Sequence, residues 1–477
     1  MNKLFLLAII ISINSIHTFG QSWPLIIGDE CVDESAALAQ YNDSTYIIIR
    51  TEDCGDQSKY YISHFNLNGE VLSDEEIIVD PQYMLKGFFS IIQDDLGNYY
   101  AYGNCEDTYN FNENQTYVLK YNSDFEYIQS YVAGRPDISE YVRDLYFVNN
   151  TFFLAGFSEN TIDDFLYKLN TDFEITEELL IDTVTGFGPS KLSMDFDGNE
   201  LIMFMYTKKA YYIDTAAMLI NSTHVIEDVI AISLREVLPL PESERYVLPF
   251  LNQLGTEGDT YTDLIIQFRD KNLSLLSESF ITIDTMGIIQ AKNTLNSYGD
   301  NIWLSYSTYR EAIAIFYEEI NHPIGVMKFN SDGDILYEGY IDGGANFVVY
   351  ATLALQDGGA LILTTRYDWN TPENKRDIYI FRVDADGDLI LDVDDSPIQQ
   401  FDFLVYPNPV SDYLIIKSQL IQFAFVEIYN MNGQLVNRNE KLSTELKIDL
   451  SQLSAGIYTY RIFTEKGVMQ TGKFVKN

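Results

Sequence analysis

Basic residues are scarce in this chain of 477 residues, which has 30 Lys and Arg against 71 Asp and Glu and a formal net charge of −41. Proteins that bind DNA or RNA neutralise phosphates with a surface rich in Lys and Arg. Proteins that dock on anionic lipid need the same positive charge. The composition therefore argues against nucleic acids and anionic membrane surfaces as partners.

Long apolar runs are lacking after the N-terminus. The chain begins with Lys3, an apolar run at residues 4–13 and the small residues Thr18 and Gly20, which is the pattern of a secretory signal peptide. The run is too short for a transmembrane helix, which needs ~20 residues. We therefore expect a signal peptide at residues 1–20 and an exported protein without a membrane span. Because no cysteine follows the predicted cleavage site, lipid attachment is not expected there.

Histidine is also scarce, and after the predicted signal peptide only His64, His224 and His322 remain. They fall in different segments, whereas a zinc site or a Ser-His-Asp triad needs His side chains that converge. The chain lacks GxSxG, HExxH and Gly-rich phosphate-binding motifs. The sequence therefore assigns no catalytic residue.

Helical periodicity is nearly absent, and one hairpin pattern recurs along the chain instead. The pattern is an alternating apolar strand, a polar turn and a second strand rich in Ile, Leu, Tyr and Phe. The copies are AALAQYNDSTYIIIR, SIIQDDLGNYYAYG, DLYFVNNTFFLAGF, LSMDFDGNELIMFMY, EVLPLPESERYVLPF, NTLNSYGDNIWLSY and TLALQDGGALILTT. Their turns fall near positions 43, 96, 150, 198, 243, 300 and 358. This spacing matches the period of ~40 to 50 residues in propeller blades, with modest insertions.

A second hairpin follows each copy. These hairpins are YISHFNLNGEVL, YVLKYNSDFEYI, FLYKLNTDFEIT, AMLINSTHVIED, LIIQFRDKNLSLL, GVMKFNSDGDILY and IYIFRVDADGDLIL. Two hairpins supply four antiparallel strands, which make one propeller blade. We therefore predict an all-β fold with a seven-bladed β-propeller over residues 21–400. If residues 23–27 form an outer strand, we expect it to pair with the last blade and close the ring, which protects strand edges.

The repeats resemble a group of bacterial propeller-like repeats. In that group a Trp-containing strand precedes a Gly-rich turn, a DGGY segment and a KLD.NG hairpin. Here the first copy has WPLIIGDE at residues 23–30, the sixth has MKFNSDG at residues 327–333, and the seventh has Asp357, Gly358 and Gly359. The resemblance implies the same propeller architecture.

Cys31, Cys54 and Cys105 are an odd number of cysteines for an exported chain. The first hairpin turn centres between Asn42 and Asp43, so residues whose numbers sum to 85 face each other, as Cys31 and Cys54 do. Facing residues have Cβ atoms ~4.5 to 5.5 Å apart, which suits a disulfide after small adjustment. A Cys31–Cys54 disulfide and two free thiols both stay open. We expect Cys105 to be a passive, half-buried thiol.

The best metal-binding pattern is DADGDLILDVDD. Its residues Asp384, Asp386 and Asp388 alternate like the first ligands of a calcium loop, and Asp395 falls at the twelfth place. Gly387, however, stands at the fourth place rather than the sixth. Similar turns recur as NSDGD and NLNGE, so hairpin geometry explains the same residues and is the favoured interpretation. No cofactor other than this calcium ion is indicated.

Paired carboxylates are another route to catalysis, because glycoside hydrolysis needs two Asp or Glu ~5 to 9 Å apart. Glu140 and Asp144 are expected near one mouth of the ring, with Asp33 and Glu34 in the equivalent place of the first blade. A solvated acidic rim explains the same residues and is favoured.

Residues 401–477 differ from the rest of the chain in charge, with eight Lys or Arg and seven Asp or Glu. Short alternating strands and a tight turn at Asn432 and Gly433 indicate a compact all-β module. Pro407 and Pro409 prevent regular strand pairing at its start. We predict a small Ig-like β-sandwich that folds separately from the propeller.

This module closely resembles the type A C-terminal sorting domain of type IX secretion cargo. The resemblance is carried by YPNP at residues 406–409, VEIYNMNGQLV at 426–436, LSAGIYTY at 453–460 and GKFVK at 472–476. It implies a sorting signal that includes Tyr406, Pro407, Asn408, Pro409, Asn432, Gly433, Gly456, Tyr458, Gly472, Lys473 and Lys476. It also implies recognition by the type IX secretion machinery, and a protein secreted or held at the outer-membrane surface of a Gram-negative bacterium.

Two functions fit these observations. The first is a secreted or surface-displayed binding module for a glycan or a protein. The second is a carbohydrate hydrolase or lyase that uses carboxylates in the central channel. The scarcity of His and the lack of a catalytic motif favour the binding module. A plugged channel would support it, whereas a deep channel with two facing carboxylates of raised pKa would favour the enzyme.

Overall fold

The computed structural model divides into two compact units, Met1–Asp392 and Val393–Asn477. The structure describes residues 23–28, 31–53, 58–108, 114–135, 138–159, 161, 163–182, 188–226, 233–234, 236–254, 261–281, 287–289, 293–309, 323–341, 346–367, 376–390, 404–417, 423–430, 435–443, 445–464 and 467–477. The predicted signal peptide lies outside these residues. Within the described ranges, the structure contains no helix with the length and apolar character that a bilayer crossing requires.

The first unit is built from β-sheets. An eight-stranded sheet contains β28 (Asn346–Ala354), β29 (Ala360–Tyr367), β30 (Arg376–Val383) and β1 (Leu25–Ile27), together with β2 (Val32–Gln40), β3 (Thr45–Asp53), β4 (Ser58–Asn66) and β5 (Val71–Glu76). Its two halves are joined by the single residue pair Val32 and Arg376. Each half therefore has four antiparallel strands.

Three four-stranded sheets follow along the chain. The first has β6 (Tyr83–Gln93), β7 (Tyr99–Asp107), β8 (Asn114–Tyr121) and β9 (Tyr127–Ala133). The second has β10 (Glu140–Val148), β11 (Thr151–Ser158), β12 (Asp163–Leu169) and β13 (Ile175–Asp182). The third has β14 (Pro189–Met194), β15 (Leu201–Met205), β16 (Lys209–Asp214) and β17 (Leu219–Val225).

Two five-stranded sheets complete the unit. One has β18 (Ser233–Leu234), β19 (Leu238–Leu240), β20 (Arg245–Leu254), β21 (Tyr261–Asp270) and β22 (Leu275–Ile281), with the short 3-10 helix η1 (Pro241–Ser243) before β20. The other has β23 (Gly287–Ile289), β24 (Leu295–Tyr298), β25 (Asn301–Tyr309), β26 (Ile324–Phe329) and β27 (Ile335–Ile341). In each, two short strands pair with one neighbour and together serve as the innermost strand.

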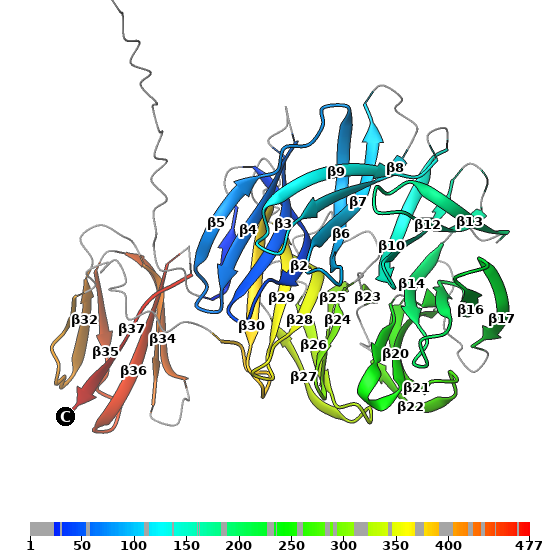
Figure 1. Cartoon of the computed structure of the whole chain (residues 1–477). Helices are drawn as coiled ribbons and strands as arrows, with labels where there is room; N and C mark the ends of the chain where they lie inside the picture. Colours follow the sequence, from blue (N-terminus) through cyan, green and yellow to red (C-terminus); the bar gives the residue numbers. More distant parts are fainter. Residues whose placement is uncertain are drawn as a thin grey trace, which may run out of the picture. The chain divides into compact units, whose positions relative to one another are not determined.

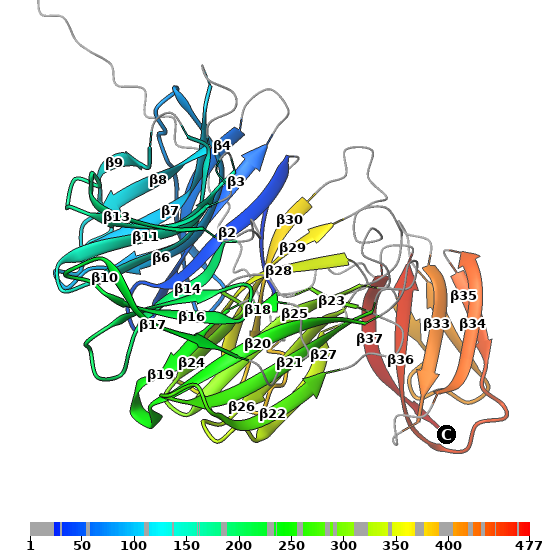
Figure 2. The ribbon, with the colours of Figure 1, turned by 90° about the vertical axis from the view of Figure 1, so that its right-hand side faces the viewer.

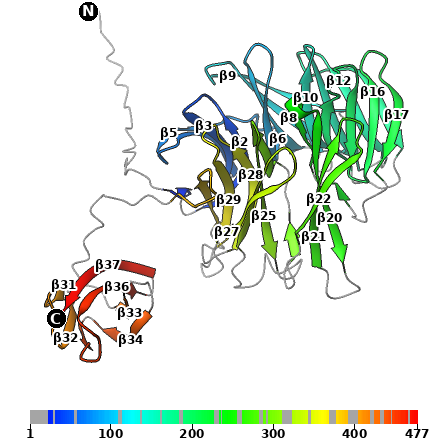
Figure 3. The same ribbon diagram turned by 90° about the horizontal axis from the view of Figure 1, so that it is seen from below.

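The sheets follow one another around a common centre, and β28 lies beside β2 (Figure 1, Figure 2 and Figure 3). Hydrophobic cores join each sheet to the next: β2–β5 to β6–β9, then to β10–β13, β14–β17, β18–β22, β23–β27 and β28–β30. A further core joins β28–β30 and β1 back to β3 and β4. The arrangement is therefore closed on itself, as in a β-propeller-like fold.

Burial along the strands follows from this arrangement. The second strand of a sheet is covered on both faces, so residues such as the LIMFM of β15 are all buried. The outer strands β22 (LLSESFI) and β27 (ILYEGYI) are mostly exposed and carry Ser, Glu and Gly between their apolar residues. Continuous apolar runs in the sequence thus mark the middle strands.

Ring closure uses β1, the first described strand. Strand β1 pairs antiparallel with β30, with Leu25 opposite Ile380 and Ile27 opposite Ile378. Leu25 is fully buried, and the ring N–H of Trp23 donates a hydrogen bond to the carbonyl oxygen of Leu67 at 2.9 Å. The predicted closing strand at residues 23–27 is confirmed.

Most of the predicted hairpins are present in the structure, but the second hairpin of the fourth repeat is wrong. The segment AMLINSTHVIED is predicted to contain the turn, yet Ser222, Thr223 and His224 in its middle lie inside β17 and pair with β16. The turn falls at residues 215–218 instead, where the Asp214 carboxylate accepts the N–H groups of Ala216 and Ala217. A side-chain oxygen that caps backbone N–H groups decides where the chain turns.

The last predicted hairpin also differs. After the turn at Asp384, the chain makes only an isolated bridge between Val383 and Leu389 within the described residues. The place of the fourth strand beside β30 is taken by β1. The N-terminal segment therefore supplies the strand that the sequence pattern assigned to the residues after Asp388.

The two ends of the sheets differ. At one end, which we call the turn end, the first strand turns into the second and the third into the fourth. At the opposite end, which we call the loop end, the second strand connects to the third and each sheet connects to the next.

The second unit has two sheets. One contains β31 (Leu404–Tyr406), β32 (Tyr413–Lys417) and β35 (Glu445–Asp449), and the other contains β33 (Phe423–Tyr429), β34 (Leu435–Ser443), β36 (Gly456–Thr464) and β37 (Gly467–Lys476). Ile416 and Ile448 of the first sheet and Ile428 and Ile462 of the second belong to one fully buried core. Two sheets therefore face each other around a single apolar layer.

Candidate functional site

The innermost strands of the first unit are distorted at one level. Bulges lie at Ser35/Ala37 in β2, Phe88/Ser90 in β6, Val142/Asp144 in β10, Pro189/Lys191 in β14 and Val349/Ala351 in β28. In the five-stranded sheets the inner strand is interrupted instead, between β18 and β19 and between β23 and β24. Bulges re-aim side chains and often lie beside functional sites. We call these distortions together the bulge belt.

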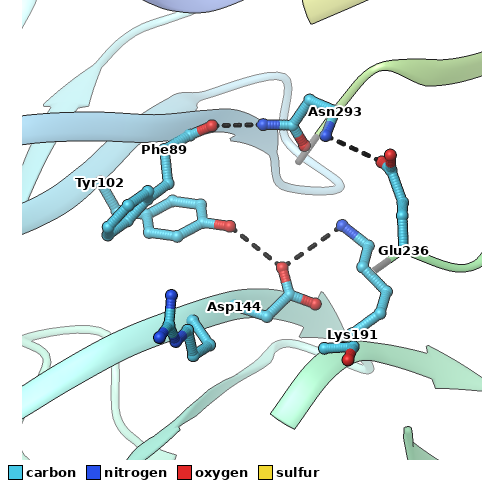
Figure 4. Close-up of a pocket in the computed structure, with 8 residues that line it drawn as sticks. Phe89, Tyr102, Asp144, Lys191, Glu236 and Asn293 are labelled. Atoms are coloured by element: carbon cyan, nitrogen blue, oxygen red, sulfur yellow. Dashed lines mark hydrogen bonds and ion pairs between the residues drawn. The ribbon is translucent and has the colours of Figure 1, made fainter. Parts of the chain in front are cut away.

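Part of the bulge belt lines a small cavity with mostly polar side chains (Figure 4). It is lined by Phe89, Tyr102, Arg143, Asp144, Ser190, Lys191, Glu236 and Asn293. These residues belong to β6, β7, β10 and β14 and to the two interrupted inner strands. The cavity has room for about one water molecule.

Asp144 has three partners at the cavity and is 2% exposed. Its carboxylate accepts hydrogen bonds from the Tyr102 hydroxyl at 3.0 Å and the backbone N–H of Leu192 at 2.7 Å, and it pairs with the Lys191 ammonium at 3.3 Å. The donors come from two strands, with Tyr102 in β7 and both Lys191 and Leu192 in β14. Asp144 therefore ties β10 to both of its neighbouring sheets.

Electrostatics keeps these partners in their usual protonation states. Burial alone lowers the pKa of Lys191, but the carboxylates of Asp144 and Glu236 outweigh it and the pKa lies above its ordinary value. Burial, followed by the Asp144 charge, raises the pKa of Tyr102 well above its ordinary value. Lys191 is thus a cation and Tyr102 a neutral donor at physiological pH.

Glu236 and Asn293 bridge the other side of the cavity. The Glu236 carboxylate accepts the backbone N–H groups of Asn293, Thr294 and Leu295 at 3.0, 3.2 and 3.3 Å. The Asn293 side-chain amide donates to the carbonyl oxygen of Phe89, which lies in the sheet of β6 (Figure 4). A hydrogen bond therefore crosses between two sheets that are not neighbours along the chain.

The carboxylates expected near one mouth are engaged as well. Asp33 is fully buried and pairs with the Arg50 guanidinium at 2.8 Å. Glu140 is 1% exposed, pairs with Arg135 at 2.8 Å and accepts the Tyr167 hydroxyl. The side chain of Glu34 lies outside the described residues. Buried carboxylates held by cations and hydroxyl groups are structural acceptors, and their charge is compensated in place.

Sequence reasoning identified Asp144 but missed Lys191, Glu236 and Asn293. A signal for them does exist. Lys191 interrupts an apolar strand, and Glu236 and Asn293 stand where the first strand of a repeat breaks its alternation. A single polar residue inside an expected inner strand is thus a marker of the bulge belt.

The cysteines divide into one bonded residue and one free thiol among the described residues. Cys31 is disulfide-bonded, and Cys105 is a free, buried thiol. Burial raises the pKa of Cys105 to about 12, which makes it a poor nucleophile. Cys54 lies outside the described residues. The register that suggested its pairing holds at residues 32–35, where Val32 faces Asp53, and shifts by one beyond the bulge.

The acidic turn at Asp384 has the geometry of a hairpin cap. The Asp384 carboxylate accepts the backbone N–H groups of Asp386 and Asp388 at 3.0 and 2.9 Å. Among the described residues, no group of three His, Cys, Asp or Glu side chains is arranged to hold a metal ion. Asp395 lies outside the described residues, so a calcium site that includes it stays a prediction.

Several residues of the predicted sorting signal lie in or contact β37, the last strand of the second unit. The Asn408 side chain accepts the N–H of Val475 at 2.9 Å and donates to the carbonyl oxygen of Lys473 at 3.3 Å. Tyr458 stacks on Phe474 with ring centroids 5.6 Å apart. In β36 and β37, Gly456 faces Lys476 and Gly472 faces Tyr460.

The remaining residues of the predicted signal are placed as follows. Tyr406 ends β31 and is 42% exposed, with Pro407 and Pro409 after it. Asn432 and Gly433 lie outside the described residues. The pieces YPNP and GKFVK, far apart in sequence, therefore form one contact region, and whether the machinery reads it stays a prediction.

A comparison with protein families gave a match for the second unit. Residues 404–477 match the family described as the secretion system C-terminal sorting domain. Curated proteins gave no match.

Solved structures that are similar to this chain have low sequence identity. They include a chain of a mitotic checkpoint complex (10% identity, TM-score 0.43, 79% of this chain and 98% of that chain). Raptor of Chaetomium thermophilum has 12% identity and a TM-score of 0.45, over 76% of this chain and 29% of that chain. The β-propeller domain of Cps50 (Swd1) of Myceliophteria thermophila has 10% identity and a TM-score of 0.45, over 76% and 99%.

Proposed function

We propose that this cargo of the type IX secretion system acts outside the cell as a binding module for a glycan or a protein. In this proposal residues 1–20 are a signal peptide, residues 21–400 a seven-bladed β-propeller and residues 401–477 an Ig-like sorting domain. The sorting tail implies a secreted or cell-surface protein. Recognition of the tail by the secretion machinery and attachment at the outer-membrane surface belong to the proposal.

The blade count is supported by the interfaces between sheets. Each half of the eight-stranded sheet counts as one blade, because the halves share only the pair of Val32 and Arg376. Each interface between successive blades has its own core, and the last core contains Leu25 of β1. Four strands per blade and a closing strand from the N-terminus are the features of a closed propeller.

One observation carries the choice of binding over catalysis: among the described residues, the carboxylates that line the cavity of the bulge belt are held by the chain's own hydrogen bonds and ion pairs. Asp144 pairs with Lys191, and Glu236 accepts three backbone N–H groups. The cavity between them has room for about one water molecule, whereas a sugar ring needs several times that volume. Two carboxylates that flank a glycosidic bond have no place to act here.

A disulfide between Cys31 and Cys54 is also part of the proposal. The proposal is supported by Cys31, which is disulfide-bonded, and by the neighbouring pair in the register, in which Val32 faces Asp53. An oxidising exterior favours such a bond. It would fix the start of β2 to the end of β3, directly after the closing strand.

The test uses the mature chain, residues 21–477, in a glycan-array screen, a pull-down of cell-surface proteins and a polysaccharide-degradation screen. We expect a ligand in one of the first two and no degradation products. The double variant Asp144→Asn/Glu236→Gln, checked for folding, is the matched control, because it should leave binding unchanged. Degradation that disappears in this variant would establish the hydrolase or lyase instead.

A further inference from the structure

An aromatic pair lies at the loop end, where the sheet of β10–β13 meets the sheet of β6–β9. Tyr141 of β10 and Phe157 of β11 face each other across the strands. Their rings are nearly parallel, at 12°, with centroids 5.2 Å apart, and both side chains are half-buried. The pair is held in place by the sheet and does not depend on a loop.

One cationic side chain of the protein already lies against this aromatic pair. The guanidinium of Arg143 lies 5.0 Å from the centroid of the Phe157 ring. Arg143 also lines the polar cavity of the bulge belt. Arg143 and Tyr141 therefore both lie against the Phe157 ring, and the three side chains form one cluster.

Tyr141 bonds through its hydroxyl group to two neighbouring side chains. The hydroxyl accepts the Asn114 side-chain amide at 2.9 Å and donates to the carboxylate of exposed Glu159 at 3.4 Å. Burial, followed by the Glu159 charge, raises the pKa of Tyr141. Tyr141 is thus a half-buried ring whose hydroxyl contacts an exposed carboxylate.

We propose that Tyr141 is the docking point for an arginine or lysine side chain on a basic polypeptide partner. The proposal rests on the proposed function and names the class of ligand. An aromatic face attracts a cation, and the exposed Glu159 carboxylate supplies a charge that a guanidinium or ammonium group pairs with. The strong negative charge of the chain draws a basic partner to it over a longer range. A neutral sugar would gain nothing from this charge.

The experiment measures binding of a fluorescently labelled nona-arginine peptide to the mature chain, with a glycine–serine peptide of equal length as the blank. Tyr141→Leu is the test variant, and Tyr127→Leu, at an exposed tyrosine of β9, is its control. We expect Tyr141→Leu to weaken binding about tenfold and Tyr127→Leu to leave it unchanged. Tyr141→Phe keeps the ring and should bind within about twofold of the parent.

The charged partner is tested in the same way. Glu159→Gln should weaken binding about threefold, whereas Glu126→Gln, at a turn of the opposite end, should not. Equal losses in Glu159→Gln and Glu126→Gln, or equal binding by Tyr141→Leu and Tyr127→Leu, would show attraction by net charge alone and overturn the proposal. Unfolding midpoints of all variants control for damage to the fold.

Two further outcomes separate this inference from the function on which it rests. A neutral glycan whose binding is lost in Tyr141→Leu would make Tyr141 a sugar site, which overturns the basic partner but keeps the binding module. Polysaccharide degradation without any peptide binding would overturn both. Tight binding of nona-arginine that weakens in Tyr141→Leu at about 0.5 M as well as at about 0.05 M salt supports a specific contact.

Discussion

The turn end of the sheets and the bulge belt are built on the same repeat, yet they differ in how regular they are. At the turn end, one device recurs: an Asn or Asp side chain accepts the backbone N–H groups two and four residues later. It is found at Asn66, Asn122, Asn170, Asp270, Asn330 and Asp384. In the bulge belt, by contrast, each sheet contributes a different polar residue.

The regular end has a common backbone requirement. The residue three places after the capping Asn or Asp has a positive φ in all six turns, whether it is Gly69, Gly333 or Gly387, or Phe125, Phe173 or Leu273. The three non-glycine side chains are buried between neighbouring sheets. Local chemistry fixes these turns, so they repeat. In the bulge belt, the polar residue of each sheet is instead determined by the residues that face it from other sheets. The residue type therefore varies from one sheet to the next.

The largest loss of folding stability is expected where ring closure is broken, because both the turn end and the bulge belt depend on a closed ring. Replacing fully buried Leu25 of β1 by Asp places a carboxylate in the core that joins β30 to β3. We expect the free energy of unfolding to fall by about 4 kcal/mol or more, since an unpaired buried charge is costly. Urea unfolding and limited proteolysis measure the change.

The neighbouring residue in the same strand is the control for closure. Ile26 is 42% exposed, so Ile26→Asp should cost less than about 1 kcal/mol. Equal losses in the two variants would mean that β1 contributes through its backbone pairing and not through the core. The contrast between them measures how much the apolar closure stabilises the ring.

The next largest effect is expected in the bulge belt. Asp144→Asn leaves the Lys191 ammonium without its carboxylate and should cost about 2 kcal/mol, below a fully buried pair because the Lys191 side chain is 29% exposed. Lys191→Met in the same background should restore part of the loss. A double-mutant cycle by urea unfolding gives the coupling energy, and a value near zero would contradict the pairing of these two residues.

The sequence predicts the turn end far better than the bulge belt. Hairpin positions and the caps at Asn66 and Asn330 follow from residues within five places of each other, which a single sequence displays. The bulge before Asp144 cannot be derived from residues close in sequence, because it is defined by two residues of β10 facing one residue of β11. The misplaced hairpin near His224 has a different origin: Asp214 caps the N–H groups of Ala216 and Ala217, and the sequence offered two nearby segments with suitable turn residues.

A smaller effect is expected within the turn end, between two glycines that share a positive φ. Gly333 has φ 89°, and a Cβ added there would lie 2.4 Å from the Ser277 hydroxyl oxygen of the neighbouring sheet. Gly198 has φ 72° and nothing within 4 Å. Gly198→Ala should cost about 1 kcal/mol for the backbone alone, and Gly333→Ala about 1 kcal/mol more for the contact. Thermal unfolding compares the two, and equal costs would mean that the turn moves away from its neighbour without penalty.

The smallest effect is a pH dependence at the turn end. His64 lies between the rings of Tyr41 and Phe125, at 5.6 and 5.4 Å, and burial lowers its pKa, opposed in part by the Glu75 carboxylate. Because the folded pKa of His64 is below the unfolded one, the unfolded state binds the proton more readily, and His64 destabilises the fold as the pH falls below about 6.5.

The variant His64→Phe keeps an aromatic side chain at this position and removes the titration. We therefore expect the melting temperature of the parent to fall more than that of His64→Phe between about pH 7.5 and pH 5. Parallel curves would show that the turn end tolerates a charged imidazolium, and that its packing is looser than the aromatic contacts indicate.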